Sequence, residues 1–245
     1  MLLKNKIAII TGAGKGIGKE TALDFAREGA NLVLVSRTLE DLKKTSQQVE
    51  KYNAKTLCMT TNIASETDVK KMVADTLSTF GRIDILVANA GIHLRKTIID
   101  TSVADWDEMM EINLRGTFLC CREVVKVMTD QDYGKIIIIS SESGKKGSAS
   151  QGAYCTTKFG QIGFTEVLTD EVKDYNINVN AVLPSATNTP LIRRSYPEVN
   201  HEALTKPESI AKVITFMASE NASAIKGASI AVWNAQNYMP NLFNT

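Results

Sequence analysis

The start of the chain constrains the fold most, because an apolar run there leads into a glycine-rich loop and then a helical pattern. Residues 7–10 read Ile-Ala-Ile-Ile, as expected for a parallel strand buried on both faces. Gly12, Gly16 and Gly18 follow, and an amphipathic pattern extends from about Gly16 to Glu28. Glycines let a pyrophosphate approach the backbone, and the first helical turn offers free N–H groups. The segment therefore predicts a dinucleotide-binding unit, although its Gly-x-x-x-Gly-x-Gly spacing also fits a plain glycine-rich turn.

Strand and helix patterns alternate through the rest of the sequence. Further strands are expected at residues 31–35, 55–60, 84–88, 136–140, 177–183 and 230–232. Helices are expected at residues 39–52, 65–80, 103–128 and 153–175, and from residue 207 onward. This alternation predicts one α/β domain over residues 1–245, a Rossmann-type doubly wound parallel sheet of about seven strands with helices on both faces. Residues 185–206 lack a regular pattern and are predicted to form a lid over the substrate.

The composition excludes several other kinds of protein. Hydrophobic residues make up 44% of the chain, enough for a sizeable core, and the formal net charge of +1 gives no reason to expect a nucleic-acid or membrane partner. No apolar run approaches the roughly 18 residues that span a bilayer, and the N-terminus does not resemble a signal peptide. The four cysteines lack the spacing of a zinc site, so we expect no metal, reduced thiols and a cytoplasmic protein.

The second expected strand indicates which cofactor binds. An acidic residue near the end of this strand usually holds the ribose 2′-OH of NAD, but Ser36 and Arg37 occupy that place here. The planar guanidinium of Arg37 can pair with a 2′-phosphate, and Lys15 in the glycine loop adds a second cation. Both could instead be solvated surface charges. The pattern favours NADP(H) over NAD(H).

The candidate reaction centre lies between Ser141 and Lys158. Tyr154 and Lys158 are four residues apart, so on a helix their side chains share one face. An ammonium beside a phenol favours the phenolate and lowers a pKa that is ordinarily about 10. Ser141 follows an isoleucine-rich strand and can hold a carbonyl oxygen at its end. The stretch therefore predicts a centre for proton transfer to or from a carbonyl substrate.

Together, these motifs resemble the short-chain dehydrogenase/reductase family in its shorter form, and they look most like its 3-oxoacyl-carrier-protein reductases. The resemblance assigns the cofactor loop to Thr11, Gly12, Gly16, Ile17 and Gly18. It assigns further cofactor contacts to Asn62, Ile63, Asn89, Ala90, Gly91, Pro184, Thr187 and Thr189. It assigns catalytic roles to Asn113, Ser141, Tyr154 and Lys158, and Ser141 fits the family spacing better than Ser140.

The resemblance also implies a mechanism, namely hydride transfer between nicotinamide C4 and a carbonyl carbon. Tyr154 would act as general acid, and Lys158 would lower its pKa and bind the nicotinamide ribose. Ser141 would hydrogen-bond the carbonyl oxygen, and Asn113 would hold a water that links Lys158 to solvent. The expected partner is a small-molecule carbonyl or secondary alcohol, and the expected assembly is a homotetramer or a dimer.

Several alternatives stay open at this point. The substrate could be a 3-oxoacyl thioester, a sugar or polyol, or another secondary alcohol. The chain could also be a nucleotide-binding regulator without turnover, although the complete set of catalytic residues argues against this. A dehydratase or epimerase of the longer family form is disfavoured, because 245 residues leave no room for the extra substrate domain.

The chain departs from the usual family pattern at four places. Ala88 replaces the first Asn of an Asn-Asn-Ala-Gly motif, and Asn62-Ile63 stands where Asp-Val is common. Ser185 replaces a glycine after the sixth strand. Because glycine permits backbone conformations that serine does not, the backbone path beside the nicotinamide is expected to differ here. Trp233-Asn234-Ala235 replaces Asp-Gly-Gly, so that Trp233 is either an interface anchor or a core filler.

Other polar and reactive side chains are more consistent with ordinary structural or surface roles than with functional ones. His93 and His201 read as ordinary loop histidines, and Cys155 reads as a packing residue beside Tyr154. Two cationic pairs read as solvated charges that would become useful with an acidic or phosphopantetheine-bearing substrate: Lys145-Lys146 and Arg193-Arg194.

Overall fold

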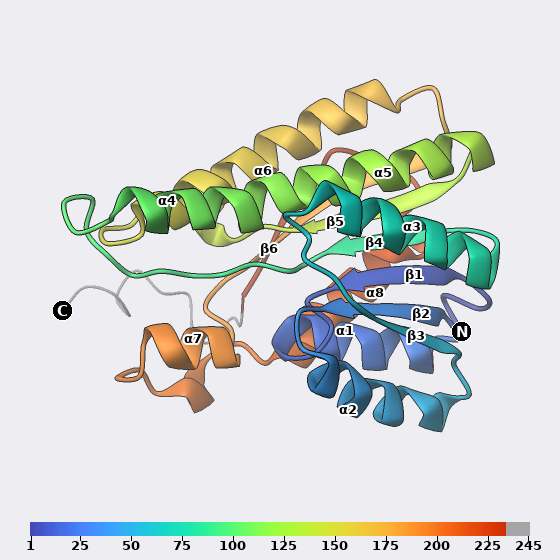
Figure 1. The fold of residues 1–245 in the computed structure, drawn as a ribbon, viewed down its shortest axis with the longest axis horizontal. Helices are drawn as coiled ribbons and strands as arrows, with labels where there is room; N and C mark the ends of the chain where they lie inside the picture. The colour runs from blue at the N-terminus through green and yellow to red at the C-terminus, as the bar shows by residue number, and fades with distance from the viewer. Residues whose placement is uncertain (234–245) are drawn as a thin grey trace.

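A computed structural model describes residues 1–233 of the chain as one three-layer α/β domain (Figure 1). The central sheet has seven parallel strands in the order β3-β2-β1-β4-β5-β6-β7. The strand order reverses between β1 and β4, and ligands of doubly wound sheets bind beside such a reversal, at the carboxyl ends of the strands. The predicted fold class is therefore confirmed.

The strands follow the apolar runs closely. They span Ile7–Thr11 (β1), Asn31–Ser36 (β2), Thr56–Thr60 (β3), Ile85–Ala88 (β4), Gly134–Ile139 (β5), Ile177–Pro184 (β6) and Ser229–Val232 (β7). Every residue of β1, β4, β5 and β6 is buried, as expected for strands with helices on both faces.

Helices cover both faces of the sheet, as Figure 1 shows. One face carries Gly16–Arg27 (α1), Leu39–Val49 (α2) and Pro207–Ala218 (α8), and their apolar side chains share one core with alternate strand residues. The other face carries Glu66–Phe80 (α3), Gly116–Gln131 (α5) and Gly152–Glu171 (α6), which pack in a second core. Helix α3 begins and ends as the sequence predicts, since the Ser65 hydroxyl caps its first turn and Gly81 takes a left-handed φ of 76° after its last. None of the helices in the described part is long and apolar enough to cross a membrane.

The structure corrects the expected helix at residues 103–128. It is divided into Val103–Met109 (α4), a π-helical segment at Met110–Arg115 and then α5. Since wider π turns occur mostly as single insertions at functional sites, this segment draws attention to Asn113, which it contains. A side-chain pattern cannot distinguish such a turn from an ordinary helix, because the apolar spacing is nearly the same.

The expected lid also contains more regular structure than predicted. Residues Pro190–Ser195 form a short helix (α7), which begins at Pro190 and is capped by the Thr189 hydroxyl. A single 3₁₀ turn follows at His201–Ala203. The prediction of an irregular stretch over residues 185–206 is therefore wrong for these two segments.

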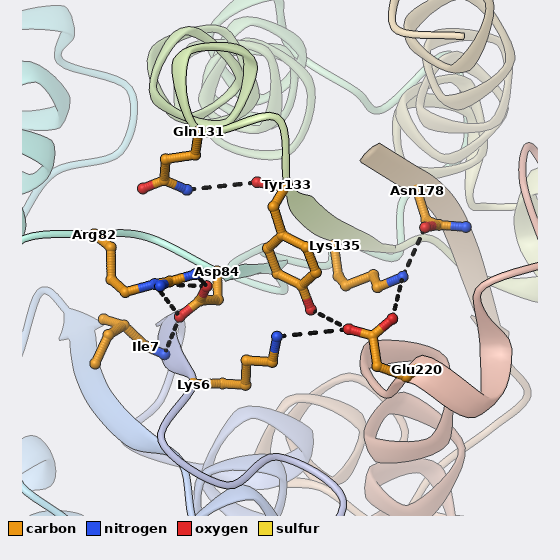
Figure 2. A network of polar contacts seen from close by, with 9 residues as sticks. All are labelled: Lys6, Ile7, Arg82, Asp84, Gln131, Tyr133, Lys135, Asn178 and Glu220. Carbon is orange, nitrogen blue, oxygen red and sulfur yellow. Dashed lines mark hydrogen bonds and ion pairs between the residues drawn. The ribbon is translucent and has the colours of Figure 1, made fainter. Parts of the chain in front are cut away.

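A polar network closes the amino-terminal edge of the sheet, opposite the carboxyl ends (Figure 2). Lys135 on β5 is 1% exposed, and its ammonium donates to Asn178 Oδ1 at 2.7 Å and lies 3.6 Å from Glu220 Oε2. The same carboxylate accepts a 2.6 Å hydrogen bond from the Tyr133 hydroxyl and lies 3.5 Å from Lys6 Nζ. The network ties the turn after α8 to β1 and β5, and so holds the sheet at the edge remote from the carboxyl ends.

Candidate active site

A cavity of about 390 Å³ opens at the carboxyl ends of β4, β5 and β6, beneath α7. Side chains from both halves of the sheet line it, because the strand order reverses beside it. Its walls include nine of the predicted site residues: Ile17, Asn89, Gly91, Ser141, Tyr154, Lys158, Pro184, Thr187 and Thr189. The cavity therefore brings the candidate reaction centre together with Ile17 of the cofactor loop and with Asn89 and Thr189, which contact that loop.

The glycine loop is shaped so that side chains would not fit at two of its glycines. Gly12 has a left-handed φ of 69°, and a Cβ placed there would lie 2.7 Å from Asn89 Nδ2. A Cβ at Gly18 would overlap the carbonyl oxygen of Gly12. Asn89 holds the loop in place, since its Nδ2 donates to the Thr11 carbonyl at 2.8 Å. The backbone is thus bare at the start of α1, which is the arrangement that fits the pyrophosphate of a dinucleotide.

Two cations lie near the carboxyl end of β2, but they differ in their partners. Arg37 is exposed directly after β2, while the Ser36 hydroxyl is occupied in a local turn with the backbone of Thr38. Lys15 Nζ lies 2.9 Å from Asp41 Oδ2, so a carboxylate already balances its charge. Arg37 is therefore the better placed of the two to meet a phosphate on the adenine ribose.

The two residues predicted to contact the adenine, Asn62 and Ile63, lie in different environments after β3. Asn62 is exposed, and its Oδ1 accepts from the Ala64 backbone at 3.1 Å. Ile63 is buried in the core against Gly116, where an added Cβ would lie 2.6 Å from the Ile63 side chain. An adenine here would therefore meet the Asn62 side chain and the Ile63 backbone rather than the Ile63 side chain.

The chain after β6 reaches the cavity without the expected glycine. Ser185 donates its N–H to Val232 O at 3.0 Å, and its φ is not among the positive values in the described chain. A serine therefore fits this backbone path without strain. Thr187 is buried and donates its hydroxyl to Ser185 O at 2.7 Å, while Thr189 caps α7 and lies against Gly16 of the glycine loop.

The two serines at the end of β5 have different environments. Ser140 is buried, and its hydroxyl donates to the main-chain carbonyl of Lys158 at 2.9 Å. Ser141 lines the cavity beside Tyr154 and accepts from Ser143 N–H at 3.1 Å. The geometry therefore favours Ser141 over Ser140, as the spacing to Tyr154 predicts.

Tyr154 and Lys158 lie together on α6, with Lys158 Nζ 5.5 Å from the centroid of the Tyr154 ring. Burial raises the pKa of Tyr154 to about 12, and the hydrogen bond with Ser141 opposes only part of that rise. Burial also lowers the pKa of Lys158 to about 7. The pKa of Tyr154 is therefore raised in this structure and not lowered as the sequence predicts, because desolvation by burial is the largest effect on it.

Asn113 is fully buried behind this pair. Its side-chain Oδ1 accepts from Ile92 N–H at 2.8 Å, and its Nδ2 donates to Ile92 O at 2.9 Å. Its main-chain carbonyl accepts a 2.8 Å hydrogen bond from Gln161 Nε2, while Gln161 Oε1 accepts from Lys158 Nζ at 2.9 Å. The Gln161 amide thus links Lys158 to Asn113 directly, a contact that the motifs did not indicate.

The outer wall of the cavity is polar and aromatic, and the sequence did not favour a role for most of its members. The His93 ring lies edge-on to Tyr154 with 4.5 Å between centroids, and Nδ1 is 2.9 Å from Ser195 Oγ on α7. Burial lowers the pKa of His93, so its ring is neutral near pH 7. Gln151 Oε1 lies 3.4 Å from both His93 Nε2 and Ser143 Oγ. His93 therefore borders the pocket, against the expectation of an ordinary loop histidine.

The remaining candidates lie at the rim or away from the cavity. Lys146 lines the opening, whereas Lys145 donates to Ser229 O at 3.3 Å. Arg193 donates to Asn188 Oδ1 at 2.8 Å, and His201 Nε2 lies 2.9 Å from Tyr196 O within the lid. The cysteines are free thiols, three of them buried: Cys120, Cys121 and Cys155. Among residues 1–233 no cluster of three or more His, Cys, Asp or Glu side chains could hold a metal ion.

Known proteins are similar to this chain in both sequence and structure. The family described as short chain dehydrogenase matches residues 6–200. The chain is 35% identical over 240 residues to 3-oxoacyl-[acyl-carrier-protein] reductase FabG of Thermotoga maritima, with 95% of this chain and 98% of the relative covered. The structure superposes on levodione reductase with a TM-score of 0.91 and 31% identity, covering 96% and 98% of the two chains. It superposes on a short chain dehydrogenase of Mycobacterium paratuberculosis bound to NAD with a TM-score of 0.87 and 27% identity, covering 95% and 97%.

Proposed function

The chain belongs to the short-chain dehydrogenase family of oxidoreductases, and we propose that it reduces a carbonyl group to a secondary alcohol with NADPH. The observation that carries the proposal is the cavity that Ser141, Tyr154 and Lys158 line together with Ile17 of the glycine loop. When bound, the nicotinamide supplies the hydride, and the protein supplies position and the proton.

Four residues have separate roles in the proposed reaction. Tyr154 donates the proton to the carbonyl oxygen, and its raised pKa keeps the phenol in the acid form at neutral pH. Ser141 lines the same cavity as that phenol and so lies where it can hold the same oxygen as negative charge develops. Lys158 lies beside the phenol, where its ammonium opposes part of the effect of burial and so eases the loss of the Tyr154 proton. Asn113 fixes the strand-to-helix connection at Ile92, which forms part of the cavity wall.

The preference for NADP(H) is supported by the end of β2. No carboxylate occupies residues 36–39, and the exposed guanidinium of Arg37 suits a 2′-phosphate. Lys15 adds less, because its ion pair with Asp41 at 2.9 Å must be loosened first. A structural neighbour at 27% identity is bound to NAD. Titration of this protein with NADPH and with NADH therefore tests the proposed preference.

For the substrate we propose a 3-oxoacyl thioester, as the name of the Thermotoga maritima relative indicates for that protein. Lys146 at the rim of the cavity gives an acidic carrier group a partner. A second candidate, a sugar, polyol or other polar secondary alcohol, is favoured by the hydrogen-bonding wall of His93, Gln151 and Ser143. A regulator that binds NADP without turnover is the least favoured, because it would not need the four catalytic residues.

A panel of carbonyl substrates tests the proposal directly. Purified protein is mixed with NADPH or NADH and with acyl thioesters, sugars or simple ketones, and cofactor oxidation is followed by absorbance. We expect turnover with NADPH and a 3-oxoacyl thioester. Turnover only with sugars or other polar ketones and aldehydes would select the second candidate, and tight NADPH binding without any turnover would select the regulator.

We further propose that the chain forms a homo-oligomer, a tetramer or a dimer, through the outer surfaces of α5 and α6. Three large apolar side chains are exposed there, Phe118 at 41%, Phe159 at 46% and Val167 at 56%, and such clusters on soluble proteins commonly mark contacts. Light scattering after size-exclusion chromatography tests this, and a monomer at micromolar concentration would contradict it. The four free thiols support a reducing compartment such as the cytoplasm.

A further inference from the structure

Gln161 lies at the centre of a buried hydrogen-bond network behind the candidate reaction centre. It is 1% exposed and follows Lys158 by three residues on α6, so the two side chains share a helix face. Its Oε1 accepts from Lys158 Nζ at 2.9 Å, and its Nε2 donates to Asn113 O and to Thr117 Oγ1, both at 2.8 Å. One amide therefore joins α6 to the π-helical segment and the start of α5.

The chemistry of the neighbours determines how this amide is oriented. The Lys158 ammonium can only donate, so it requires the amide oxygen, and the Asn113 carbonyl can only accept, so it requires the amide nitrogen. The Thr117 hydroxyl donates to the same carbonyl at 2.7 Å and can accept from Gln161 at the same time. A carboxylate at this position would face the Asn113 carbonyl with an acceptor, and an apolar side chain would leave the ammonium with one acceptor fewer.

The same network determines what Lys158 can do in the cavity. Within residues 1–233 its ammonium donates to Ile139 O and to Gln161 Oε1, both at 2.9 Å, which leaves one N–H for the side of Tyr154 and the cofactor. The other titratable groups that face this region are Tyr154 on the same helix and His93 on the segment after β4. Burial disfavours the charged form of Lys158, and a hydrogen bond to an acceptor at this position favours that form.

We propose that Gln161 is a positioning residue for the reductase reaction, acting through Lys158. Its oxygen keeps the lysine charged and aimed at Tyr154, and its nitrogen anchors the pair to the Asn113 carbonyl. The inference rests on the proposed function, since it names a residue that supports the same reaction. The charge state of Lys158 can be measured without any turnover.

The variant Gln161→Leu tests the proposal, because it keeps roughly the side-chain volume and removes both hydrogen bonds. Losing one hydrogen bond to the ammonium is expected to lower the pKa of Lys158 by about one pH unit, and the charged fraction at pH 7 then falls about fivefold. The ¹³Cε resonance of Lys158, identified by its absence in Lys158→Met, reports this titration directly. In the active enzyme, kcat at pH 7 should fall about fivefold while KM for the carbonyl substrate changes less than twofold.

Thr165→Val is the matched control, because it removes a buried hydroxyl one turn along α6. That hydroxyl donates only to the Gln161 main-chain carbonyl, at 2.8 Å, and does not contact Lys158. We expect the control to keep the wild-type titration of Lys158 and the wild-type pH profile of kcat. If Gln161→Leu and Thr165→Val give the same Lys158 titration and the same pH profile of kcat, Gln161 has only a structural role and the proposal is overturned.

A second variant keeps the proposal testable if Gln161→Leu fails to fold. Gln161→Glu keeps an acceptor for Lys158 and places a negative charge beside it, so the pKa of Lys158 should rise. An unchanged titration in this variant would also overturn the proposal. If the wild-type chain turns over no carbonyl substrate, the proposed function fails, but the titrations still decide whether Gln161 governs the charge of Lys158.

Discussion

Glu220→Gln perturbs the polar network at the amino-terminal edge of the sheet without touching the cavity (Figure 2). The substitution keeps the shape of the side chain and removes its charge. The carboxylate accepts from Tyr133 at 2.6 Å and is the only acidic group paired with Lys135 among the described residues. After the change, Lys135 keeps the 2.7 Å hydrogen bond to Asn178 but loses its counter-ion.

The magnitude follows from how deeply each partner is buried. A hydrogen bond to a charged acceptor contributes about 1.5–3 kcal/mol, but Glu220 is 57% exposed, so solvent screens much of that value. Lys135 is 1% exposed, and leaving its charge without a counter-ion adds a cost that Asn178 partly offsets. We expect a loss of about 1.5 kcal/mol in the free energy of unfolding, which lowers Tm by about 4 °C in a domain of this size.

The pH dependence of this loss has a defined sign. The hydrogen bond from Tyr133 and then the nearby lysines hold the pKa of Glu220 below its ordinary value. The stability from the carboxylate is therefore fully present above the unfolded pKa of about 4.3 and is lost as pH falls through the lower folded value. The difference between wild type and variant should be largest above about pH 5 and should shrink below about pH 4.

Chemical denaturation at pH 7 and at about pH 3 measures both effects, with Asp170→Asn as the control. Asp170 is 78% exposed and pairs with Lys173 at 3.2 Å, so its neutralisation should change the free energy of unfolding by less than about 0.5 kcal/mol. If Glu220→Gln is no more destabilising than Asp170→Asn, the network does not stabilise the sheet as argued. A loss that is the same at both pH values would refute the role of the carboxylate charge.

Two further substitutions test the cofactor site. Arg37→Ala should raise KM for NADPH about 10–100-fold and leave KM for NADH within about twofold, because only NADPH carries the 2′-phosphate; an equal effect on both cofactors would mean that NADP(H) is the wrong assignment. Gly18→Ala should abolish cofactor binding, measured by fluorescence titration, because the added Cβ would overlap Gly12 O and lie 2.6 Å from Asn89 Nδ2. Gly163→Ala on α6 is its control, since no heavy atom lies within 4 Å of the added Cβ; cofactor binding by both variants alike would refute the argument from close packing.

Much of the fold follows from patterns that are local in the sequence. The apolar strands and the regular alternation with helices predict a parallel sheet, and the order of the motifs places the glycine loop on the first unit. Ser65 and Gly81 mark the ends of α3 for physical reasons that need no tertiary structure. Helix α7 was missed because it has only six residues, although Thr189 and Pro190 are a recognisable start signal.

The site was predictable residue by residue, but its electrostatics were not. Tyr154, Lys158 and Ser141 follow from their spacing, yet the direction of the phenol pKa depends on desolvation, which only the packed structure shows. Gln161 and His93 each look ordinary in the sequence. Their contacts cross from α6 to the π-helical segment and from the β4 end to α7, and no local pattern encodes those approaches. A glutamine three residues after Lys158, on the same face of the helix, was the signal available in the sequence.

Tyr154→Phe tests the central claim most directly, because it removes one hydroxyl and leaves the ring that packs against His93. Turnover of the best carbonyl substrate and the affinity for NADPH are measured on the same preparation. We expect turnover to fall by at least about a hundredfold, as for the loss of a general acid, with NADPH affinity within about twofold of wild type. Wild-type turnover by the variant would show that Tyr154 is not the proton donor and would contradict the account.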